Sequence, residues 1–293
     1  MTIANGARVF QPVLTCEGRV GKPVLHSANK ISKKIPMKIH RLFLLPAFAL
    51  LLAGCATQRE WFPPDPEAGR QIARWVATSA EENPHGGFKC LVYLPTYYSS
   101  QNEKQKWPLL FYLHGSPDCG DDVDKIKRGG IARLLAQPVS RKDWPFITVS
   151  PLSPAGWFKP AELSALLDAL EREYNVDTER IYVTGLSMGG FGTWAWAAHE
   201  PQRFAAVAPV AGRGDPSQAA RLVDLPVWAF HGDADGNVKP SGSINMVEAI
   251  KKAGGTKAKL TLYPGVGHNS WDRTYGDPAF YKWLLSNTRK KTE

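Results

Sequence analysis

The sequence predicts a single α/β domain built on a doubly wound, mostly parallel sheet with helices on both faces. From residue 88 onward, short β-branched and aromatic runs alternate with longer helical patterns. Several of the short runs are apolar almost throughout, as is typical of parallel strands covered on both faces. The chain has 293 residues, of which 43% are hydrophobic. It is therefore long and apolar enough to bury one large core.

The individual segments follow one another in the order that such a sheet requires. The predicted strands are Phe88–Leu94, Leu109–His114, Phe146–Ser150, Arg180–Thr184, Ala205–Val210, Val227–His231 and Leu260–Tyr263. The predicted helices are Glu162–Tyr174, Met188–His199 and Ser241–Ala253. The first of these helices places leucines at i, i+3, i+4 and i+7, which gives one apolar stripe. Because strand and helix alternate without a second boundary, we expect one layered α/β domain.

The net charge of +9 is concentrated near the N-terminus. Residues 1–54 contain eight Lys or Arg and one acidic residue, whereas the rest of the chain has 28 basic and 26 acidic residues. The predicted domain is thus almost neutral and shows no basic stripe, which argues against a nucleic-acid-binding protein. No apolar run approaches the roughly 20 residues that a membrane-spanning helix needs.

A secretory signal is predicted shortly before the domain. Residues 42–53 form a run of 12 mostly apolar residues, with Lys38 and Arg41 before it and Gly54-Cys55 after it. The tetrad Leu52-Ala53-Gly54-Cys55 resembles the lipobox of bacterial lipoproteins. That resemblance implies that the signal is removed before Cys55 and that Cys55 then carries a lipid. A buried hydrophobic helix is the alternative interpretation of the same run.

The position of this signal sets the expected organisation of the chain. A signal should begin near the start of a protein, and residues 1–36 show neither strand nor helix periodicity. We therefore expect translation to begin at Met37, with residues 1–36 as a non-native extension. Residues 37–54 are the predicted signal peptide, 55–66 a Pro-containing tether, and 67–293 the single α/β domain. The expected location is the bacterial cell envelope, with a lipid anchor on the periplasmic or outer-membrane side.

The remaining cysteines leave two alternatives open. Cys16 and Cys55 fall in the extension and at the lipidation position, so that Cys90 and Cys119 remain. An exported protein meets an oxidising compartment, where these two residues could form one disulfide bridge. Two separate buried thiols are the alternative, because the sequence does not show how far apart their Cα atoms lie.

The pentapeptide Gly185-Leu186-Ser187-Met188-Gly189 fits the pattern G-x-S-x-G. It stands directly after a predicted strand and before a predicted helix, the context in which this pattern holds a nucleophilic serine. The turn is so sharp that the positions two before and two after the serine have no room for side chains. Ser187 is therefore the candidate nucleophile, whereas the pentapeptide without this context would be a weak signal.

A serine hydroxyl needs a base to take its proton, and three histidines follow Ser187 in the chain. His199 lies in the predicted helix after the nucleophile and is expected to be exposed. His231 ends an apolar strand and is expected to have a structural role in the following loop. His268 lies in a glycine-flanked loop after the last strand, where its imidazole can reach the carboxyl edge of the sheet. His268 is therefore the predicted base.

The segment from Trp107 to Trp283 resembles the α/β-hydrolase carboxylesterases of the phospholipase/carboxylesterase and dienelactone-hydrolase type, including feruloyl- and acetyl-esterase-like members. The resemblance includes His231-Gly232-x-x-Asp235-x-x-Val238, in which the family pattern makes the aspartate the triad acid. It implies the α/β-hydrolase fold and assigns the acid to Asp235, with Asp233 on the same loop but outside the triad. Only about 16 residues separate the predicted strands that end at Val210 and begin at Val227. We therefore expect no large cap domain there and an open cleft.

Two backbone N–H groups should stabilise the negative charge that develops on the substrate oxygen. One is expected from Met188, directly after the nucleophile and at the N-terminus of its helix. The other is expected from Ser116, because His114-Gly115-Ser116 resembles the family's His-Gly-x segment. This chain departs from the family where Pro117-Asp118-Cys119-Gly120 replaces a more glycine-rich run. His114 itself is expected to be a structural hydrogen-bonding residue.

Aromatic residues near these loops are candidates for the substrate pocket. Trp157 follows the strand Phe146–Ser150 at the same edge of the sheet, and Trp271 lies three residues after His268. Trp194 and Trp196 are two apart on the nucleophile helix and are expected to be packing residues. The sequence contains no complete H-E-x-x-H, C-x-x-C or phosphate-binding glycine-rich motif, so we expect neither a metal nor a cofactor.

Together these observations predict a serine carboxylic-ester hydrolase that acts through a Ser-His-Asp triad and an acyl-enzyme. Its substrate would be a small ester or an ester borne on a polymer such as a polysaccharide. One alternative is a serine peptidase of the prolyl-oligopeptidase type, although the chain has no room for the additional domain of that class. A second alternative is a non-catalytic envelope lipoprotein that binds a glycan or a partner.

Overall fold

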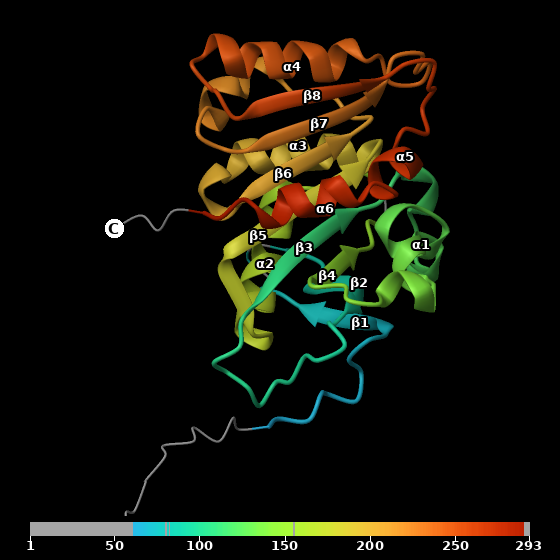
Figure 1. Ribbon diagram of the computed structural model, residues 1–293, viewed down its shortest axis with the longest axis vertical. Helices are drawn as coiled ribbons and strands as arrows, with labels where there is room; N and C mark the ends of the chain where they lie inside the picture. Colours follow the sequence, from blue (N-terminus) through green and yellow to red (C-terminus); the bar gives the residue numbers. More distant parts are fainter. Residues whose placement is uncertain (1–60, 80, 82, 155, 290–293) are drawn as a thin grey trace, which may run out of the picture. The chain divides into compact units, whose positions relative to one another are not determined.

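The computed structural model describes residues 61–79, 81, 83–154 and 156–289. Its centre is one eight-stranded sheet with the strand order β1-β2-β4-β3-β5-β6-β7-β8 (Figure 1). The strands are β1 (Gln71–Ala77), β2 (Gly87–Tyr93), β3 (Trp107–Leu113), β4 (Ile147–Pro151), β5 (Val176–Leu186), β6 (Ala206–Val210), β7 (Val227–Gly232) and β8 (Ala258–Tyr263). Strands β3 to β8 pair in parallel, whereas β1 and β2 are antiparallel to their neighbours. The expectation of a mostly parallel sheet is confirmed.

Helices pack on both faces of the sheet (Figure 1). One face carries α2 (Pro160–Glu173), α3 (Met188–His199) and α4 (Ser241–Lys252), and the other carries α1 (Gly130–Ala136), α5 (Trp271–Tyr275) and α6 (Pro278–Leu285). Short 3₁₀ helices stand in the connections: η1 (Ser116–Asp118), η2 (Val123–Arg128), η3 (Pro138–Arg141), η4 (Pro201–Arg203) and η5 (Pro216–Leu222). This layered arrangement is the doubly wound architecture that the sequence predicts.

The central strand β3 explains why apolar residues run together in this sequence. Leu109, Phe111 and Leu113 point into the core under α2, α3 and α4. Leu110 and Tyr112 point into the core on the opposite face, and all five side chains are fully buried. Because successive side chains of a strand point to opposite faces, a strand buried on both sides cannot show polar alternation.

All seven predicted strands and all three predicted helices are present, with ends that differ by up to four residues. Strand β1 was not predicted, because it is the edge strand and mixes exposed with partly buried side chains. Helices α1, α5 and α6 were also missed, since each spans only two turns or so and offers little periodicity. Between β6 and β7 the only regular element is η5, as the expectation of no large cap domain at that position requires.

Cys90 and Cys119 are both free, so the disulfide alternative is wrong; the alternative of two separate buried thiols holds for Cys90, whereas Cys119 is only half-buried. Cys90 belongs to β2 and its side chain is buried in the core, where desolvation raises the pKa of its thiol. Cys119 is half-buried, and its Sγ lies 3.8 Å from Sδ of Met188. Both side chains pack in the same hydrophobic cluster, but no bond joins their sulfur atoms.

Within residues 61–289, as far as they are described, no helix is long and apolar enough to cross a membrane. The predicted signal peptide, the lipidation position Cys55 and the first part of the predicted tether lie outside the described residues.

Candidate active site

Ser187 lies in a sharp turn between β5 and α3, and its backbone φ of +51° is in the left-handed region. A residue other than glycine adopts that region only where its surroundings force it. Here the backbone N–H of Ser187 donates to the carbonyl of Val210 at 3.0 Å. A Cβ on Gly185 would overlap the carbonyl oxygen of Gly189, and a Cβ on Gly189 would overlap that of Leu113. The glycines two before and two after Ser187 are therefore required, and the turn leaves Ser187 partly exposed.

Three side chains that the sequence predicts for catalysis form one hydrogen-bonded chain. Oγ of Ser187 lies 2.9 Å from Nε2 of His268, and Nδ1 of His268 lies 2.7 Å from Oδ2 of Asp235. Ser187 follows β5, Asp235 follows β7 and His268 follows β8. Since the carboxyl ends of parallel strands meet at one edge of the sheet, the topology brings these distant residues together.

The carboxylate of Asp235 is buried, with 3% of the residue exposed. Burial alone raises its pKa, but hydrogen bonds from His268 and from the backbone N–H groups of Val238 and Asn237 outweigh it. Both N–H groups donate to Oδ1 at 2.9 Å, which leaves Oδ2 for the imidazole. The net pKa of Asp235 is therefore lowered, and the carboxylate stays charged near neutral pH.

His231 makes a contact with Asp235 that the sequence did not show. Its Nε2 lies 2.9 Å from the carbonyl oxygen of Val238 and 3.2 Å from Oδ2 of Asp235. Because a carbonyl only accepts, Nε2 carries the proton. In the neutral ring Nδ1 then has no proton and lies 2.8 Å from Oγ of Ser243, whose hydroxyl also lies 3.0 Å from the carbonyl oxygen of Gly212. Burial lowers the pKa of His231, which favours this neutral form. The structural role expected for His231 is confirmed, and it includes holding the loop that carries Asp235.

The other candidates stand apart from the hydrogen-bonded chain. His114 is fully buried, with Nδ1 at 2.7 Å from the carbonyl of Gly115 and Nε2 accepting from the N–H of Ser153 at 3.0 Å. This is the structural role expected for it. His199 is exposed on α3, as expected. The carboxylate of Asp233 accepts a hydrogen bond from the backbone of Gly265 at 2.7 Å.

The two buried histidines predict how stability depends on pH. Burial lowers the pKa of both His114 and His231 below the ordinary value, so the unfolded chain binds their protons more readily than the folded one. Their contribution to the free energy of unfolding is fully present above about pH 6.5, where both histidines are neutral in the folded and the unfolded chain. It decreases as the pH drops below that value, because the unfolded chain then binds more protons. We expect the Tm to decrease steadily between pH 7 and pH 5 in thermal melts followed by circular dichroism. An exposed-site control, His199→Gln, should show the same decrease; a Tm that rises on acidification would contradict the expectation.

The two backbone N–H groups expected for an oxyanion hole both stand at the start of a helix. Met188 is the first residue of α3, and Ser116 is the first residue of η1. The first N–H groups of a helix have no partner within it and are available to an anion. A Cβ on Gly115 would lie 2.7 Å from Cδ1 of Leu186, so this loop runs close against the end of β5. The assignment of this role to Met188 and Ser116 stays a prediction.

The aromatic candidates take different positions. The ring of Trp271 stands edge-on to that of His268, with 5.1 Å between their centroids, and forms a wall beside the imidazole. Trp157 is 67% exposed and stacks edge-on against Phe191, one helical turn after Ser187. Trp194 and Trp196 are buried, which confirms them as packing residues.

The arrangement provides a hydroxyl beside a base whose other nitrogen faces a charged carboxylate. Such a set can transfer the proton of Ser187 to His268 and stabilise the resulting imidazolium through Asp235. In the part of the chain that the structure describes, no three His, Cys, Asp or Glu side chains are grouped so that they could hold a metal ion.

Comparison with known proteins finds similarity to hydrolases. Residues 159–277 match the model of the dienelactone hydrolase family. A protein of Escherichia coli O157:H7 that carries the name carboxymethylenebutenolidase is 32% identical over 170 residues, which is 55% of each chain. A bifunctional acetylxylan esterase/xylanase of Neocallimastix patriciarum is 37% identical over 73 residues, or 25% of this chain and 11% of that protein. The chain thus spans about half the length of the first of these relatives.

Among solved structures, a thermostable esterase aligns with a TM-score of 0.64 and 29% identity over 76% of this chain and 64% of the esterase. The sheet order, the turn at Ser187 and the matched family region agree with that similarity. Residues 159–277 thus resemble the dienelactone hydrolase family, and the fold is that of the α/β-hydrolases.

Proposed function

We propose that this chain is a serine carboxylic-ester hydrolase. The observation that carries the proposal is the hydrogen-bonded chain from Ser187 through His268 to Asp235, with distances of 2.9 and 2.7 Å. The strained turn leaves Ser187 partly exposed to solvent. The buried carboxylate of Asp235 fixes the tautomer of His268. Similarity to esterases agrees with this chemistry.

In the proposed reaction, Nε2 of His268 takes the proton of Ser187 as its Oγ attacks the carbonyl carbon of the ester. The negative charge on the former carbonyl oxygen is stabilised by the backbone N–H groups of Met188 and Ser116. The imidazolium then gives its proton to the departing alcohol, which leaves an acyl group on Ser187. Water, deprotonated by His268, attacks this acyl-enzyme and releases the acid and the free enzyme.

The substrate is proposed to be a small ester or an acyl group borne on a polymer such as a polysaccharide. Between β6 and β7 the connection is short and holds only η5, so no inserted domain covers the site from that direction. Similarity to an acetylxylan esterase agrees with a sugar-borne ester as one member of this class.

The test compares ester and amide substrates on the purified wild-type protein. We expect turnover of p-nitrophenyl acetate and of feruloyl esters, with an initial burst of p-nitrophenol equal to the enzyme concentration if deacylation limits the rate. Peptide p-nitroanilides should be poor substrates. Faster cleavage of the anilides than of the esters would favour a peptidase, and the absence of turnover of any ester would contradict the proposal.

We further propose that the protein is exported and anchored to the bacterial envelope through a lipid on Cys55, as the tetrad Leu52-Ala53-Gly54-Cys55 indicates. A lipid anchor rests on one side chain, so Cys55→Ser should move the protein from the membrane fraction to the soluble fraction. The measurement is fractionation followed by mass spectrometry of the N-terminal peptide. Activity of the solubilised Cys55→Ser protein should match that of the wild type, and an unmodified Cys55 in the membrane-bound wild type would contradict the anchor.

A further inference from the structure

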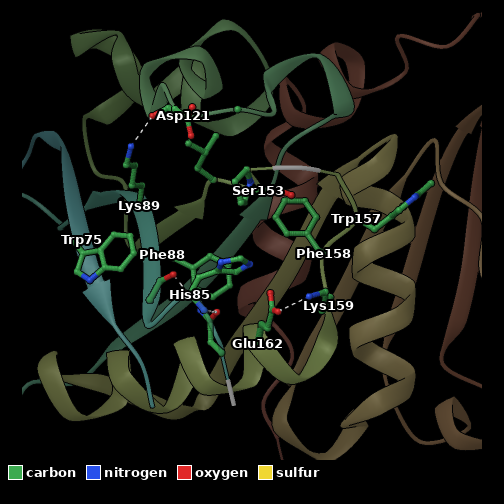
Figure 2. Close-up of a pocket in the computed structure, with 15 residues that line it drawn as sticks. Trp75, His85, Phe88, Lys89, Asp121, Ser153, Trp157, Phe158, Lys159 and Glu162 are labelled. Atoms are coloured by element: carbon green, nitrogen blue, oxygen red, sulfur yellow. Dashed lines mark hydrogen bonds and ion pairs between the residues drawn. The ribbon is translucent and has the colours of Figure 1, made fainter. Parts of the chain in front are cut away.

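A cavity of about 380 Å³ opens at the side of the sheet that carries β1 and β2 (Figure 2). Four aromatic side chains line it: Trp75, Phe88, Trp157 and Phe158. Figure 2 shows Trp75 and Phe158 on opposite sides of the cavity, with Phe88 between them. None of these side chains belongs to the hydrogen-bonded chain of Ser187, so the cavity is separate from the reacting groups.

Trp75 provides a flat apolar face. Its indole packs against the backbone of β2, where a Cβ on Gly87 would lie 2.9 Å from two ring atoms of Trp75. The glycine thus lets the ring lie close to the sheet, and 56% of Trp75 remains exposed. An aromatic ring held on one face and open on the other is a stacking surface for a ligand.

Polar side chains surround these rings, and their charges balance. Nζ of Lys159 lies 2.8 Å from Oε1 of Glu162, and Nζ of Lys89 donates to the backbone carbonyl of Asp121 at 3.0 Å. Two cations thus stand with two carboxylates around the cavity, and His85 contributes a further polar ring. Such a set favours a neutral ligand with several hydroxyl groups, because an ionic ligand would need an excess of the opposite charge.

Two residues of the cavity wall contact residues that adjoin the candidate active site. Ser153, which lines it, donates its N–H to Nε2 of His114, and the ring of Phe158 stands edge-on to that of His114 at 5.2 Å. His114 directly precedes Gly115 and Ser116 of the predicted oxyanion hole. At its other end the cavity reaches Trp157, which packs against Phe191 one turn after Ser187. The cavity wall is therefore connected to the loop of the predicted oxyanion hole through His114 and to α3 through Trp157.

We propose that this cavity is a subsite for a neutral sugar ring belonging to the alcohol part of the substrate, a proposal that rests on the proposed function. The apolar face of a pyranose packs on Trp75, and its hydroxyls bond to the polar side chains around the rim. An unbranched acyl chain would make no hydrogen bonds with these polar groups, which disfavours it as the occupant. The cavity thus selects the sugar, while Ser187 acts on the acyl group.

The first experiment compares two acetyl esters that differ only in their alcohol: p-nitrophenyl acetate and acetylated xylo-oligosaccharides. Trp75→Ala should lower kcat/KM for the sugar ester by about tenfold, since stacking on one aromatic face has that effect. It should leave kcat/KM for p-nitrophenyl acetate unchanged, and Trp75→Tyr should restore most of the sugar-ester activity. Trp61, which is 80% exposed and does not line the cavity, provides the control Trp61→Ala.

A second measurement does not depend on catalysis. The Ser187→Ala protein is titrated with xylohexaose, cellohexaose and mannohexaose by isothermal titration calorimetry. We expect at least one to bind with a Kd in the range of about 10 μM to 1 mM, and about tenfold more weakly after the additional change Trp75→Ala. Glu162→Gln, which keeps the shape of the cavity, should also weaken this binding and serves if Trp75→Ala does not fold.

The outcomes separate the subsite from the proposed function. Binding of a sugar without hydrolysis of any ester by the wild type would overturn the function and support the subsite. Hydrolysis of p-nitrophenyl acetate without binding of any of the three sugars would overturn the subsite and leave the function intact. An equal loss of activity on both esters in Trp75→Ala would also overturn it, because Trp75 would then act on the fold alone.

Discussion

Replacing Ser187 by alanine is expected to lower kcat for p-nitrophenyl acetate by about 10⁶-fold. The hydroxyl is the group that would form the acyl-enzyme, and its loss also removes the proton that His268 transfers. Residual hydrolysis should remain about 10³-fold or more above the uncatalysed rate, since the backbone N–H groups can still stabilise the charged oxygen. Steady-state assays at pH 7.5 with highly purified protein measure the difference.

The matched control is Ser217→Ala, a serine on the exposed surface of η5. It should retain kcat within about twofold, as is usual for surface substitutions. Thermal melts of both variants should be close to that of the wild type. A Ser187→Ala protein that folds and keeps kcat within tenfold of the wild type would rule out the proposed nucleophile.

Asp235→Asn is expected to lower kcat by about 10⁴-fold. The amide that replaces the carboxylate can donate a hydrogen bond to Nδ1 of His268, and the ring would then carry its proton on Nε2. In that tautomer the imidazole cannot accept the proton of Ser187, although the shape of the site is kept. KM should change little, because Asp235 is buried behind the imidazole and would not touch the substrate.

Asp233 offers a control on the same loop. Its carboxylate accepts a hydrogen bond from the backbone of Gly265 instead of facing His268, so Asp233→Asn should keep kcat within a few-fold. Equal losses in the two variants would mean that the loop, rather than the carboxylate of Asp235, sets the rate. Because the pKa of Asp235 is lowered, its protonation should not limit wild-type activity until the pH falls below about 4.

The sequence predicts the central features of this structure because they are determined locally or by chain order. The glycines around Ser187 follow from the sharpness of one turn, and close packing at Gly185 and Gly189 agrees with that reason. The apolar strands follow from burial on both faces, as Leu110 and Phe111 show. The selection of Asp235 over Asp233 came from a family resemblance, since both carboxylates lie on one loop.

Other features depend on distances that no local pattern contains. The spacing of Cys90 and Cys119 along the chain does not decide whether they pair, and the structure shows both as free thiols. The 3.2 Å contact between His231 and Asp235 arises because the loop after β7 folds back on its own strand. The aromatic cavity likewise joins β1, which the sequence analysis missed, to the loop before α2.

The central claim is that Ser187 is an activated nucleophile, and covalent labelling tests it most directly. Wild-type protein treated with a fluorophosphonate should gain one label, located on Ser187 by peptide mass spectrometry, with loss of ester hydrolysis in step with labelling. His268→Ala should label far more slowly, because its serine lacks the base. An active wild-type protein that stays unlabelled, or that is labelled on another residue as activity disappears, would contradict the account.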